Sequence, residues 1–541
     1  MRIRPIYIIT TVVFSFIVFG LFYCQIIKGN YFRDLSLNNY IRIFRQEGMR
    51  GNILDRNAKI IADNLIAFDV LVLPKKFDEK SISFLSSLLN LSPKEIKARV
   101  KKNLKSSNLP VTIFSGLSEE KAFLIKERAM EFPSISVQFS YKRYYPYAPN
   151  LAHVLGYLGK INKSLVTKLK EYGYNLEDVI GYTGVEEYMD RFLRSESGGT
   201  QIQVDSRNRP VSLLGFKAPL DGQDVTLTID IRMQQIVDRA LEGYKGSIII
   251  LNPNTGEILA MASSPNFNPN VLIEGKDTTA IKDILNNPSA KLLNRAISGA
   301  YEPASTFKLV LAVVALERNM IDVNKEFDCG GVFPIGNREF KCDHVHGYQN
   351  LENAIAHSCN IYFYRLGLKL GPDLILEYAR KLGYGQKTGI DLPYESNGFV
   401  LNYMSRLKKW YPGDTANLSI GQGETLVTPL QAVRFISVFA NQGKLVKPFI
   451  VKSVGQVEFN SPSIIDLKLR EKTLSIVRHA LLMTVLNSTG TANILNISGL
   501  KVAGKTGTAQ AASHKTNAWF LGFAPFMNPR ISFCVFLENG G

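Results

Sequence analysis

The sequence predicts an α+β protein that follows a single N-terminal transmembrane helix. Residues 6–27 contain no charged side chain, which is typical of a membrane span. Residues 246–251 and 257–262 are apolar runs on either side of a turn, which predicts two neighbouring strands. Residues 309–316 are apolar on every side and predict a helix that is buried all round. Strands and a buried helix in separate stretches favour the α+β class.

The first of these segments is long enough to cross a bilayer. Its 22 residues reach roughly 33 Å as a helix, and the hydrocarbon core of a bilayer is ~30 Å thick. Arg2 and Arg4 precede the segment, which favours a cytoplasmic tail at residues 1–5 and an exported remainder. A cleaved signal peptide is the alternative, but it would be shorter and would end in a small-x-small cleavage site. We expect a single-pass protein of the cytoplasmic membrane.

The number and distribution of charged residues indicate which kinds of partner the protein can bind. Its 541 residues allow two or three domains, and 64 basic against 47 acidic side chains give a net charge of +17. The basic residues are scattered, with short clusters at 97–105 and 406–409, and no nucleic-acid-binding motif accompanies them. We therefore expect no nucleic acid partner, and the charge favours an anionic envelope environment.

Two polar residues mark the start of the predicted buried helix. Ser305 and Lys308 are three residues apart and share one helix face. In such an apolar place a lysine shifts toward its neutral form, and a neutral amine can take the proton of a nearby hydroxyl. Alone, this S-x-x-K pattern is also explained by a serine near a helix start and a lysine that reaches out of a core helix.

Two further motifs follow in order. Ser358-Cys359-Asn360 precedes an aromatic helical run, and residues 505–508 (Lys-Thr-Gly-Thr) precede a strand-like segment at 519–523. The ordered set S-x-x-K, S-x-N and K-T-G resembles the signature of penicillin-binding proteins and serine β-lactamases. We identify no glutamate that is placed to activate a deacylating water, which favours a transpeptidase over an efficient β-lactamase.

The N-terminal half narrows the resemblance. Residues 50–57 resemble the R-G-x-I-x-D-R-x-G opening of the pedestal domain of class B penicillin-binding proteins, and residues 143–146 and 184–187 resemble further pedestal segments. Asn57-Ala58 stands where glycine is usual, and asparagine can take the left-handed conformation of glycine. We also expect residues 28–46 to form a helix that leaves the membrane.

This resemblance implies an architecture. An elongated, mixed pedestal domain spans residues 28–215, and a transpeptidase domain with an antiparallel sheet flanked by helices spans residues 216–541. The sheet of the family usually ends with a helix after the strand that residues 531–537 represent here. The domain is therefore expected to lack its C-terminal helix.

The resemblance also implies roles for the first two motifs. The family acts on peptidoglycan stem peptides that end in D-alanyl-D-alanine. Ser305 would attack the penultimate carbonyl, and Lys308 would be the base that activates it. Ser358 would relay a proton to the leaving D-alanine, and Asn360 would hydrogen-bond the substrate amide and orient Lys308. Penicillins mimic the donor and would leave Ser305 acylated.

The third motif would hold the terminal carboxylate of the donor. Lys505, Thr506 and Thr508 would place a cation beside two hydroxyls, which suits a planar anion, and Gly507 belongs to the same binding segment. Backbone N–H groups of Ser305 and Thr508 would form the oxyanion hole, which is usually a large share of the rate.

Three of the five cysteines suggest a metal site. Cys342 and His346 have C-x-x-x-H spacing, and with Cys329 and Cys359 they make a Cys₃His set. This is a complete tetrahedral set for structural zinc. The alternative is a disulfide between Cys329 and Cys342 with a free thiol on Cys359, because exported compartments favour disulfides.

The predicted metal site favours one of the possible functions of this family over the others. The penicillin-binding protein 2 subfamily, which this region resembles, carries zinc there with aspartates at some ligand positions, so Asp343 and His344 are the nearest alternative ligands. We therefore expect an elongation-type, β-lactam-inhibited D,D-transpeptidase. The alternatives are the division-type paralogue and a membrane-anchored β-lactam receptor or β-lactamase. The elongation type implies the bacterial inner membrane, a periplasmic catalytic domain, and a SEDS-family glycosyltransferase and elongation-complex proteins as partners.

Overall fold

The computed structural model describes residues 4–33, 41–104, 110–174, 178–205, 210–401, 409–510 and 515–541. The chain divides into two compact units, each built from separate stretches of sequence. The first unit comprises Met1–Gly51, Asn64–Lys142 and Arg194–Gly222. The second unit comprises Asn52–Asp63, Arg143–Leu193 and Gln223–Gly541. The expected domain boundary near residue 216 stays a prediction.

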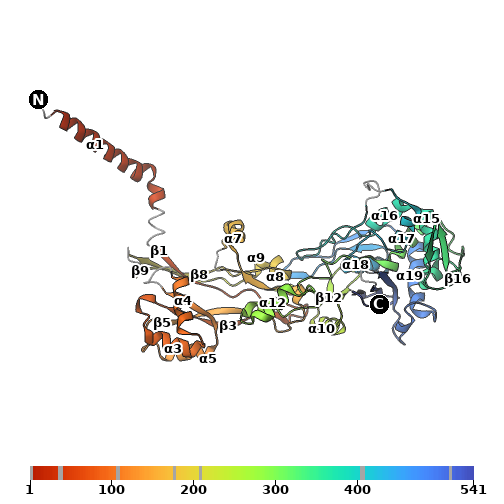
Figure 1. Ribbon diagram of the computed structural model, residues 1–541, viewed down its shortest axis with the longest axis horizontal. Helices are drawn as coiled ribbons and strands as arrows, with labels where there is room; N and C mark the ends of the chain where they lie inside the picture. Colours follow the sequence, from red (N-terminus) through yellow and green to blue (C-terminus); the bar gives the residue numbers. More distant parts are fainter. Residues whose placement is uncertain are drawn as a thin grey trace. The chain divides into compact units, whose positions relative to one another are not determined.

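The N-terminal segment is one long apolar helix. Helix α1 (Arg4–Phe22), at the N-terminal end in Figure 1, continues into the π-helical η1 (Tyr23–Ile27). The span Tyr7–Ile27 has a mean hydropathy of 2.1, and none of it is buried within the protein. An exposed helix of this composition is more stable in hydrocarbon than in water. By length and composition it can cross a membrane.

A three-stranded antiparallel sheet joins distant parts of the first unit. Its order is β1 (Ile41–Gln46), β8 (Gly198–Val204) and β9 (Pro210–Lys217). β1 pairs with β8 along its whole length. The predicted helix over residues 28–46 is therefore wrong in its last part. The partner strand lies far downstream, and pairing with it overrides the local helix preference.

The rest of the first unit packs three helices on strands. Helices α3 (Glu79–Leu89), α4 (Pro93–Asn103) and α5 (Glu119–Glu127) enclose one apolar cluster with β4 (Val111–Leu117) and β5 (Ile135–Tyr144). Val70, Leu85 and Ile96 are fully buried in this cluster. The first unit therefore has a hydrophobic core of its own.

A five-stranded antiparallel sheet forms the centre of the second unit. Its order is β12 (Ile258–Ser264), β11 (Gly246–Leu251), β23 (Ile531–Leu537), β22 (Thr516–Ala524) and β21 (Ala503–Gln510). The two strands predicted around the turn at 252–256 are confirmed as the antiparallel pair of β11 and β12. The K-T-G sequence lies on β21, at one edge of the sheet.

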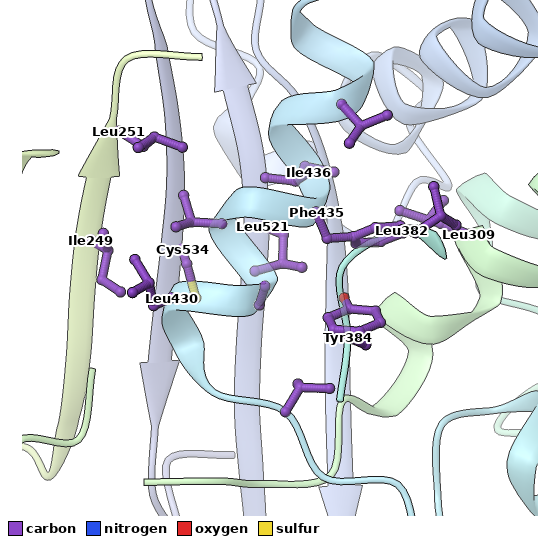
Figure 2. Packing of buried hydrophobic residues seen from close by; sticks show 14 of the residues in the cluster. Ile249, Leu251, Leu309, Leu382, Tyr384, Leu430, Phe435, Ile436, Leu521 and Cys534 are labelled. Carbon is purple, nitrogen blue, oxygen red and sulfur yellow. The ribbon is translucent and has the colours of Figure 1, made fainter. Parts of the chain in front are cut away.

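Helices cover both faces of this sheet. Helix α10 (Ile231–Ala240) packs Val237 against one face, in a cluster with Ile248. On the other face, Leu430 and Phe435 of α18 (Pro429–Ala440) pack in the cluster that contains Ile249 (Figure 2). Ile248 and Ile249 are neighbours in β11 and point to opposite faces, as strand geometry requires. The predicted α+β class with an antiparallel sheet flanked by helices is confirmed.

Helix α13 (Lys308–Glu317) lies at the centre of the helical layer. It contacts α15 (Asn360–Leu370), α16 (Pro372–Lys381) and α19 (Glu471–Leu486). All its residues from Lys308 to Leu316 are buried. The predicted all-round burial is confirmed, and it explains why no polar face exists on this helix.

The remaining described elements are β2 (Ile53–Leu54), β3 (Ile60–Val72), η2 (Pro74–Lys76), α6 (Ala152–Leu155), β6 (Leu158–Lys160), α7 (Lys163–Leu169), η3 (Lys170–Tyr172), β7 (Val179–Gly181), α8 (Gly184–Tyr188), α9 (Asp190–Leu193), β10 (Val225–Leu227), α11 (Pro269–Glu274), α12 (Thr278–Asn286), η4 (Ala304–Phe307), β13 (Phe327–Cys329), β14 (Val332–Ile335), β15 (Arg338–Lys341), β16 (Gly347–Gln349), α14 (Leu351–Ala356), α17 (Pro412–Ser419), β17 (Lys444–Val446), β18 (Val451–Val454), β19 (Val457–Glu458), β20 (Ile464–Asp466) and η6 (Asn493–Leu495).

The turn between β2 and β3 is organised by the buried Asp55. Its Oδ1 accepts hydrogen bonds from the backbone N–H of Asn57 at 2.7 Å and of Lys59 at 2.9 Å. The left-handed residue is Ala58, with a φ of 62°, so the expectation that Asn57 takes this conformation is wrong. The Asp55 carboxylate binds the backbone N–H groups on either side of Ala58, and Ala58 takes the left-handed conformation between them.

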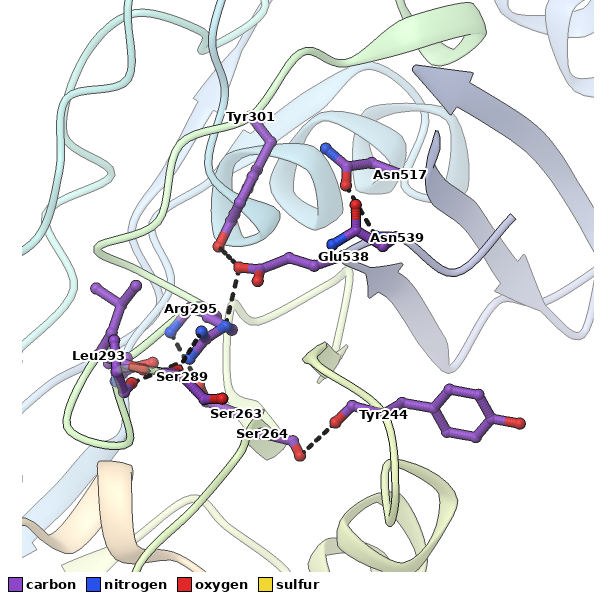
Figure 3. Close-up of polar contacts among 12 residues, drawn as sticks. Tyr244, Ser263, Ser264, Ser289, Leu293, Arg295, Tyr301, Asn517, Glu538 and Asn539 are labelled. Carbon is purple, nitrogen blue, oxygen red and sulfur yellow. Dashed lines mark hydrogen bonds and ion pairs between the residues drawn. The ribbon is translucent and has the colours of Figure 1, made fainter. Parts of the chain in front are cut away.

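An ion pair between a buried arginine and a partly buried glutamate connects the end of the sheet to the segment that leads into α13. Arg295, which is 3% exposed, donates from Nε to Glu538 Oε1 at 2.9 Å (Figure 3). The Tyr301 hydroxyl donates to the same oxygen at 2.7 Å. The remaining guanidinium nitrogens donate to the carbonyls of Ser289 and Ala290. Each of the three guanidinium nitrogens therefore donates at least one hydrogen bond inside the protein.

Replacing Glu538 with alanine should destabilise the second unit, because Arg295 would keep a buried charge without its carboxylate. We expect a loss of about 3–5 kcal/mol, the range for removing one partner of a buried pair. Thermal unfolding of the variant and the wild type measures the effect. Arg318→Ala is the matched control, since Arg318 and Glu377 form an exposed pair with side chains 50% and 60% exposed, worth ~1 kcal/mol at most. Equal Tm shifts for the two variants would contradict the prediction.

Candidate active site

The first motif lies where a 3₁₀ turn enters the buried helix. Ser305 belongs to η4 and Lys308 is the first residue of α13, so the predicted helix start is a tighter turn followed by an α-helix. Ala304, directly before Ser305, is fully buried with a φ of 52°. This left-handed conformation costs a non-glycine residue about 1–2 kcal/mol. The surroundings hold the turn, because the Ala304 N–H donates to the Gly421 carbonyl at 3.0 Å.

The Lys308 amine is buried and faces the second motif. Its Nζ donates to the Ser358 carbonyl at 2.7 Å and to Asn360 Oδ1 at 2.6 Å, and it lies 3.2 Å from Ser358 Oγ. Burial lowers the pKa of Lys308 to about 8, against the attraction of the negative charge on Cys342. The amine therefore exchanges between its charged and neutral forms close to physiological pH.

The second motif is a tight turn between two helices. Helix α14 ends at Ala356 and α15 begins at Asn360, and Ser358 between them has a φ of 57°. The Cys359 N–H donates to the Ala354 carbonyl at 2.9 Å and closes the turn. With this backbone, the side chains of Ser358 and Asn360 both reach Lys308, and Cys359 is fully buried.

The third motif presents a buried lysine on the edge strand β21. Lys505 is fully buried, and burial together with the charge of Lys308 lowers its pKa. Its Nζ donates to the Thr506 carbonyl at 3.1 Å. The Thr508 side chain is exposed.

Gly507 explains how the third motif reaches the first. A Cβ at this position would lie 3.1 Å from Thr306 Cγ2 and 3.4 Å from Ala304 Cβ. The strand therefore passes directly against the turn that carries Ser305, and a side chain there would push them apart. The Ser305 hydroxyl is partly exposed beside this contact, and no described residue hydrogen-bonds to it. The fold thus brings all three predicted motifs to one place.

The predicted metal ligands form one cluster. The ligand atoms of Cys329, Cys342, His346 and Cys359 all lie within 4.8 Å of one another. His346 Nδ1 is 3.5 Å from the sulfurs of both Cys329 and Cys342. A tetrahedral zinc with ordinary Zn–S and Zn–N bonds would separate sulfur from nitrogen by roughly 3.5 Å. The cluster therefore fits a metal ion, and Asp343 and His344 lie outside it.

All five cysteines lie in the described part of the chain, and each has a free thiol. The alternative disulfide between Cys329 and Cys342 is therefore not formed. The hydrogen bond between Cys359 and Cys342 lowers the pKa of the Cys342 thiol and raises the pKa of the Cys359 thiol, so Cys342 is the thiolate of this pair. The Asn360 N–H donates to Cys342 Sγ at 3.2 Å, so the cluster lies directly behind the second motif.

Two family descriptions match the chain. The penicillin-binding protein dimerisation domain matches residues 45–227, and the penicillin-binding protein transpeptidase domain matches residues 246–541. The chain belongs to the class B penicillin-binding proteins. The family predicted from the three motifs and the pedestal segments is thereby confirmed.

Individual relatives refine this assignment. This class B penicillin-binding protein is 32% identical to the peptidoglycan D,D-transpeptidase MrdA of Acinetobacter baumannii, over 96% of this chain and 81% of that protein. It is 30% identical to MrdA of Escherichia coli K12, over 97% and 89%. The structure of PBP2 in complex with MreC from Helicobacter pylori has a TM-score of 0.82, at 27% identity, and covers 93% of this chain and 96% of that one. The predicted elongation-type D,D-transpeptidase function is confirmed.

Sequence reasoning missed residues that support the site. The Glu302 carbonyl accepts a hydrogen bond from Trp519 Nε1 at 3.0 Å, and its carboxylate accepts one from the Gly423 N–H at 3.1 Å. Phe363 places its ring 5.7 Å from Lys308 Nζ. The aromatic run after the second motif is a signal that could have indicated Phe363. Nothing local marks Glu302, because its partners come from distant segments.

Proposed function

We propose that this class B penicillin-binding protein cross-links peptidoglycan stem peptides through an acyl-enzyme on Ser305. The observation that carries the proposal is the buried Lys308 amine, one turn after Ser305 and within hydrogen-bond distance of Ser358 and Asn360. A base with a pKa of about 8 can accept a hydroxyl proton near neutral pH.

Acylation begins when Lys308 takes the proton of Ser305 and Oγ attacks the carbonyl carbon of the penultimate D-alanine. The backbone N–H groups of Ser305 and Thr508 stabilise the negative charge that develops on the carbonyl oxygen. The peptide C–N bond then breaks, and the proton passes from Lys308 through Ser358 to the leaving amine of the terminal D-alanine. The 3.2 Å distance from Lys308 Nζ to Ser358 Oγ supports this transfer.

The third motif binds the carboxylate of the donor. Lys505, Thr506 and Thr508 surround it, and Gly507 keeps the strand against the Ser305 turn. The amine of a second peptide strand then attacks the ester carbonyl, the bond to Ser305 Oγ breaks, and Ser305 regains its proton. The new amide is the cross-link. A β-lactam presents its carbonyl and carboxylate in the same arrangement and acylates Ser305 instead.

We further propose that the metal cluster binds one structural zinc ion. Its ligands are Cys329, Cys342, His346 and Cys359, and their spacing supports this set. With four protein ligands the zinc would cross-link the chain rather than activate water. Because Cys359 lies between Ser358 and Asn360, a ligand bond on Cys359 would hold both catalytic side chains in place.

The N-terminal helix supports a membrane location. We propose a single pass through the bacterial inner membrane, with the N-terminus in the cytoplasm and the catalytic domain in the periplasm. The PBP2–MreC complex and a solved peptidoglycan synthase complex, which covers this whole chain at a TM-score of 0.74, support a SEDS-family glycosyltransferase and elongation-complex proteins as partners.

A fluorescent penicillin should label the wild-type protein on Ser305 and leave Ser305→Ala unlabelled. Mass spectrometry of the labelled peptide identifies the site. The adduct should persist for many minutes, because the sequence offers no base to activate a deacylating water. Label on the alanine variant would contradict the assignment, and rapid multiple turnover of penicillin would indicate a β-lactamase.

The acylation rate should rise with pH, because only neutral Lys308 can act as the base. Below its pKa of about 8, the neutral fraction grows about tenfold per pH unit, and the rate should level off above that pKa. Rate constants for penicillin acylation from about pH 6 to about pH 10 measure the profile. Lys308→Arg stays cationic and should be inactive throughout. A pH-independent rate would contradict the role of Lys308.

Metal analysis should find one zinc per chain, and Cys359→Ser should lose zinc, thermal stability and penicillin acylation together. The fall in acylation should be ~10²-fold, the size expected for a misplacement of about 1 Å. Cys24→Ser, in the exposed N-terminal helix, is the matched control and should keep all three. A native protein without metal that shows Cys329 linked to Cys342 in a non-reducing peptide map would contradict the zinc proposal.

A further inference from the structure

His357, the residue before Ser358, bridges two segments that the catalytic motifs themselves do not connect. Its Nδ1 lies 2.8 Å from Gln349 Oε1, and its Nε2 lies 2.8 Å from Thr489 Oγ1. Its ring also stacks on the ring of His346, with centres 5.9 Å apart and planes 3° apart. Both ring nitrogens and one ring face are therefore engaged.

The contact with Gln349 has a defined direction. Gln349 is 4% exposed, and its Nε2 donates to the carbonyls of His346 at 2.9 Å and Tyr348 at 3.0 Å. Its amide oxygen must therefore face His357, whose Nδ1 carries the hydrogen and donates. This fixes the ring to the loop that supplies a ligand to the metal cluster.

The contact with Thr489 leads to the third motif. Thr489 lies on the turn that follows α19, and the N–H of Thr491 on the same turn donates to the Ala356 carbonyl at 3.3 Å. The Thr506 hydroxyl donates to Thr491 Oγ1 at 2.8 Å. The Thr506 side chain is therefore hydrogen-bonded to the turn at residues 489–491.

We propose that His357 is a positioning residue that couples the metal-binding loop to the K-T-G strand. One ring nitrogen is hydrogen-bonded to Gln349, in the loop at residues 346–349, and the other to Thr489, in the turn that binds Thr506. The ring therefore sets the separation between the loop and the turn. The inference rests on the proposed function, in which Thr506 and Lys505 hold the carboxylate of the donor. His357 contacts no reacting atom and acts through the position of Thr506.

The test uses the full-length protein and a fluorescent penicillin in rapid-mixing experiments over a range of concentrations. These separate the dissociation constant of the initial complex from the limiting rate of acylation. His357→Ala should raise the dissociation constant about tenfold, the size expected for one lost hydrogen bond. The limiting rate should stay within about twofold, because Lys308, Ser358 and Asn360 keep their contacts, and the zinc content should not change.

Two further variants separate positioning from a loss of folding. Thr489→Val removes an exposed hydroxyl, which also lies 3.0 Å from Asn487 Oδ1 in the same turn, and should raise the dissociation constant by a similar factor. In the double variant with His357→Ala the effects should not add, since both act on one contact. His479→Ala is the matched control. His479 lies on α19 and pairs with Glu352 of α14. The variant therefore also replaces a histidine with alanine, but at a position that contacts neither the loop at 346–349 nor the turn at 489–491.

Three results would overturn the inference. They are a dissociation constant for His357→Ala equal to that of the wild type, additive effects in the double variant, and loss of zinc together with a slower limiting rate. If the wild type itself is not acylated on Ser305, the proposed function fails and this inference fails with it. The reaction of the wild type therefore distinguishes failure of the proposed function from failure of the inference about His357.

Discussion

Burial of the Lys308 amine is the constraint on which the rest of the catalytic centre depends. An ammonium group in the protein interior is destabilised by several kcal/mol unless acceptors surround it. The second motif supplies all three acceptors within reach among the described residues: the Ser358 carbonyl, Ser358 Oγ and Asn360 Oδ1. The second motif therefore supplies the hydrogen-bond acceptors of the base in the first motif, while burial lowers the pKa of that base.

The need to bring the first and second motifs together also explains why two residues of the site keep a strained backbone. Ala304 and Ser358 both occupy the left-handed region, with φ values of 52° and 57°, and neither is glycine. Such residues are stable only where neighbouring structure over-determines them. For Ala304 that structure is the Gly421 carbonyl and the edge strand at Gly507. For Ser358 it is the junction of two helices, which aims the serine and asparagine of the second motif at the same amine.

The metal cluster serves a part of the fold that has little core of its own. The strand pairs β13–β16 and β14–β15 are short, and short two-stranded ribbons are marginally stable in water. Cys329, Cys342 and His346 come from these ribbons and the loop between them, and Cys359 comes from the start of α15. A metal ion held by these residues would cross-link the ribbons to the helix that carries Asn360. The proposed role of His357 would extend this support to the K-T-G strand.

Local sequence was sufficient for the apolar N-terminal helix, the buried helix at 309–316, the order of the three motifs and the membership of the Cys₃His cluster. Each depends on composition or spacing over a few residues, and composition and spacing are visible in the chain itself. Tertiary structure alone decided that residues 41–46 are a strand and that the side chains of Glu302 and His357 contact distant segments. Their conformations and contacts are set largely by residues elsewhere in the folded chain: β8 for β1, Gly423 for Glu302, and Thr489 for His357. Pairing across such separations is decided by the whole fold, and no local propensity encodes it.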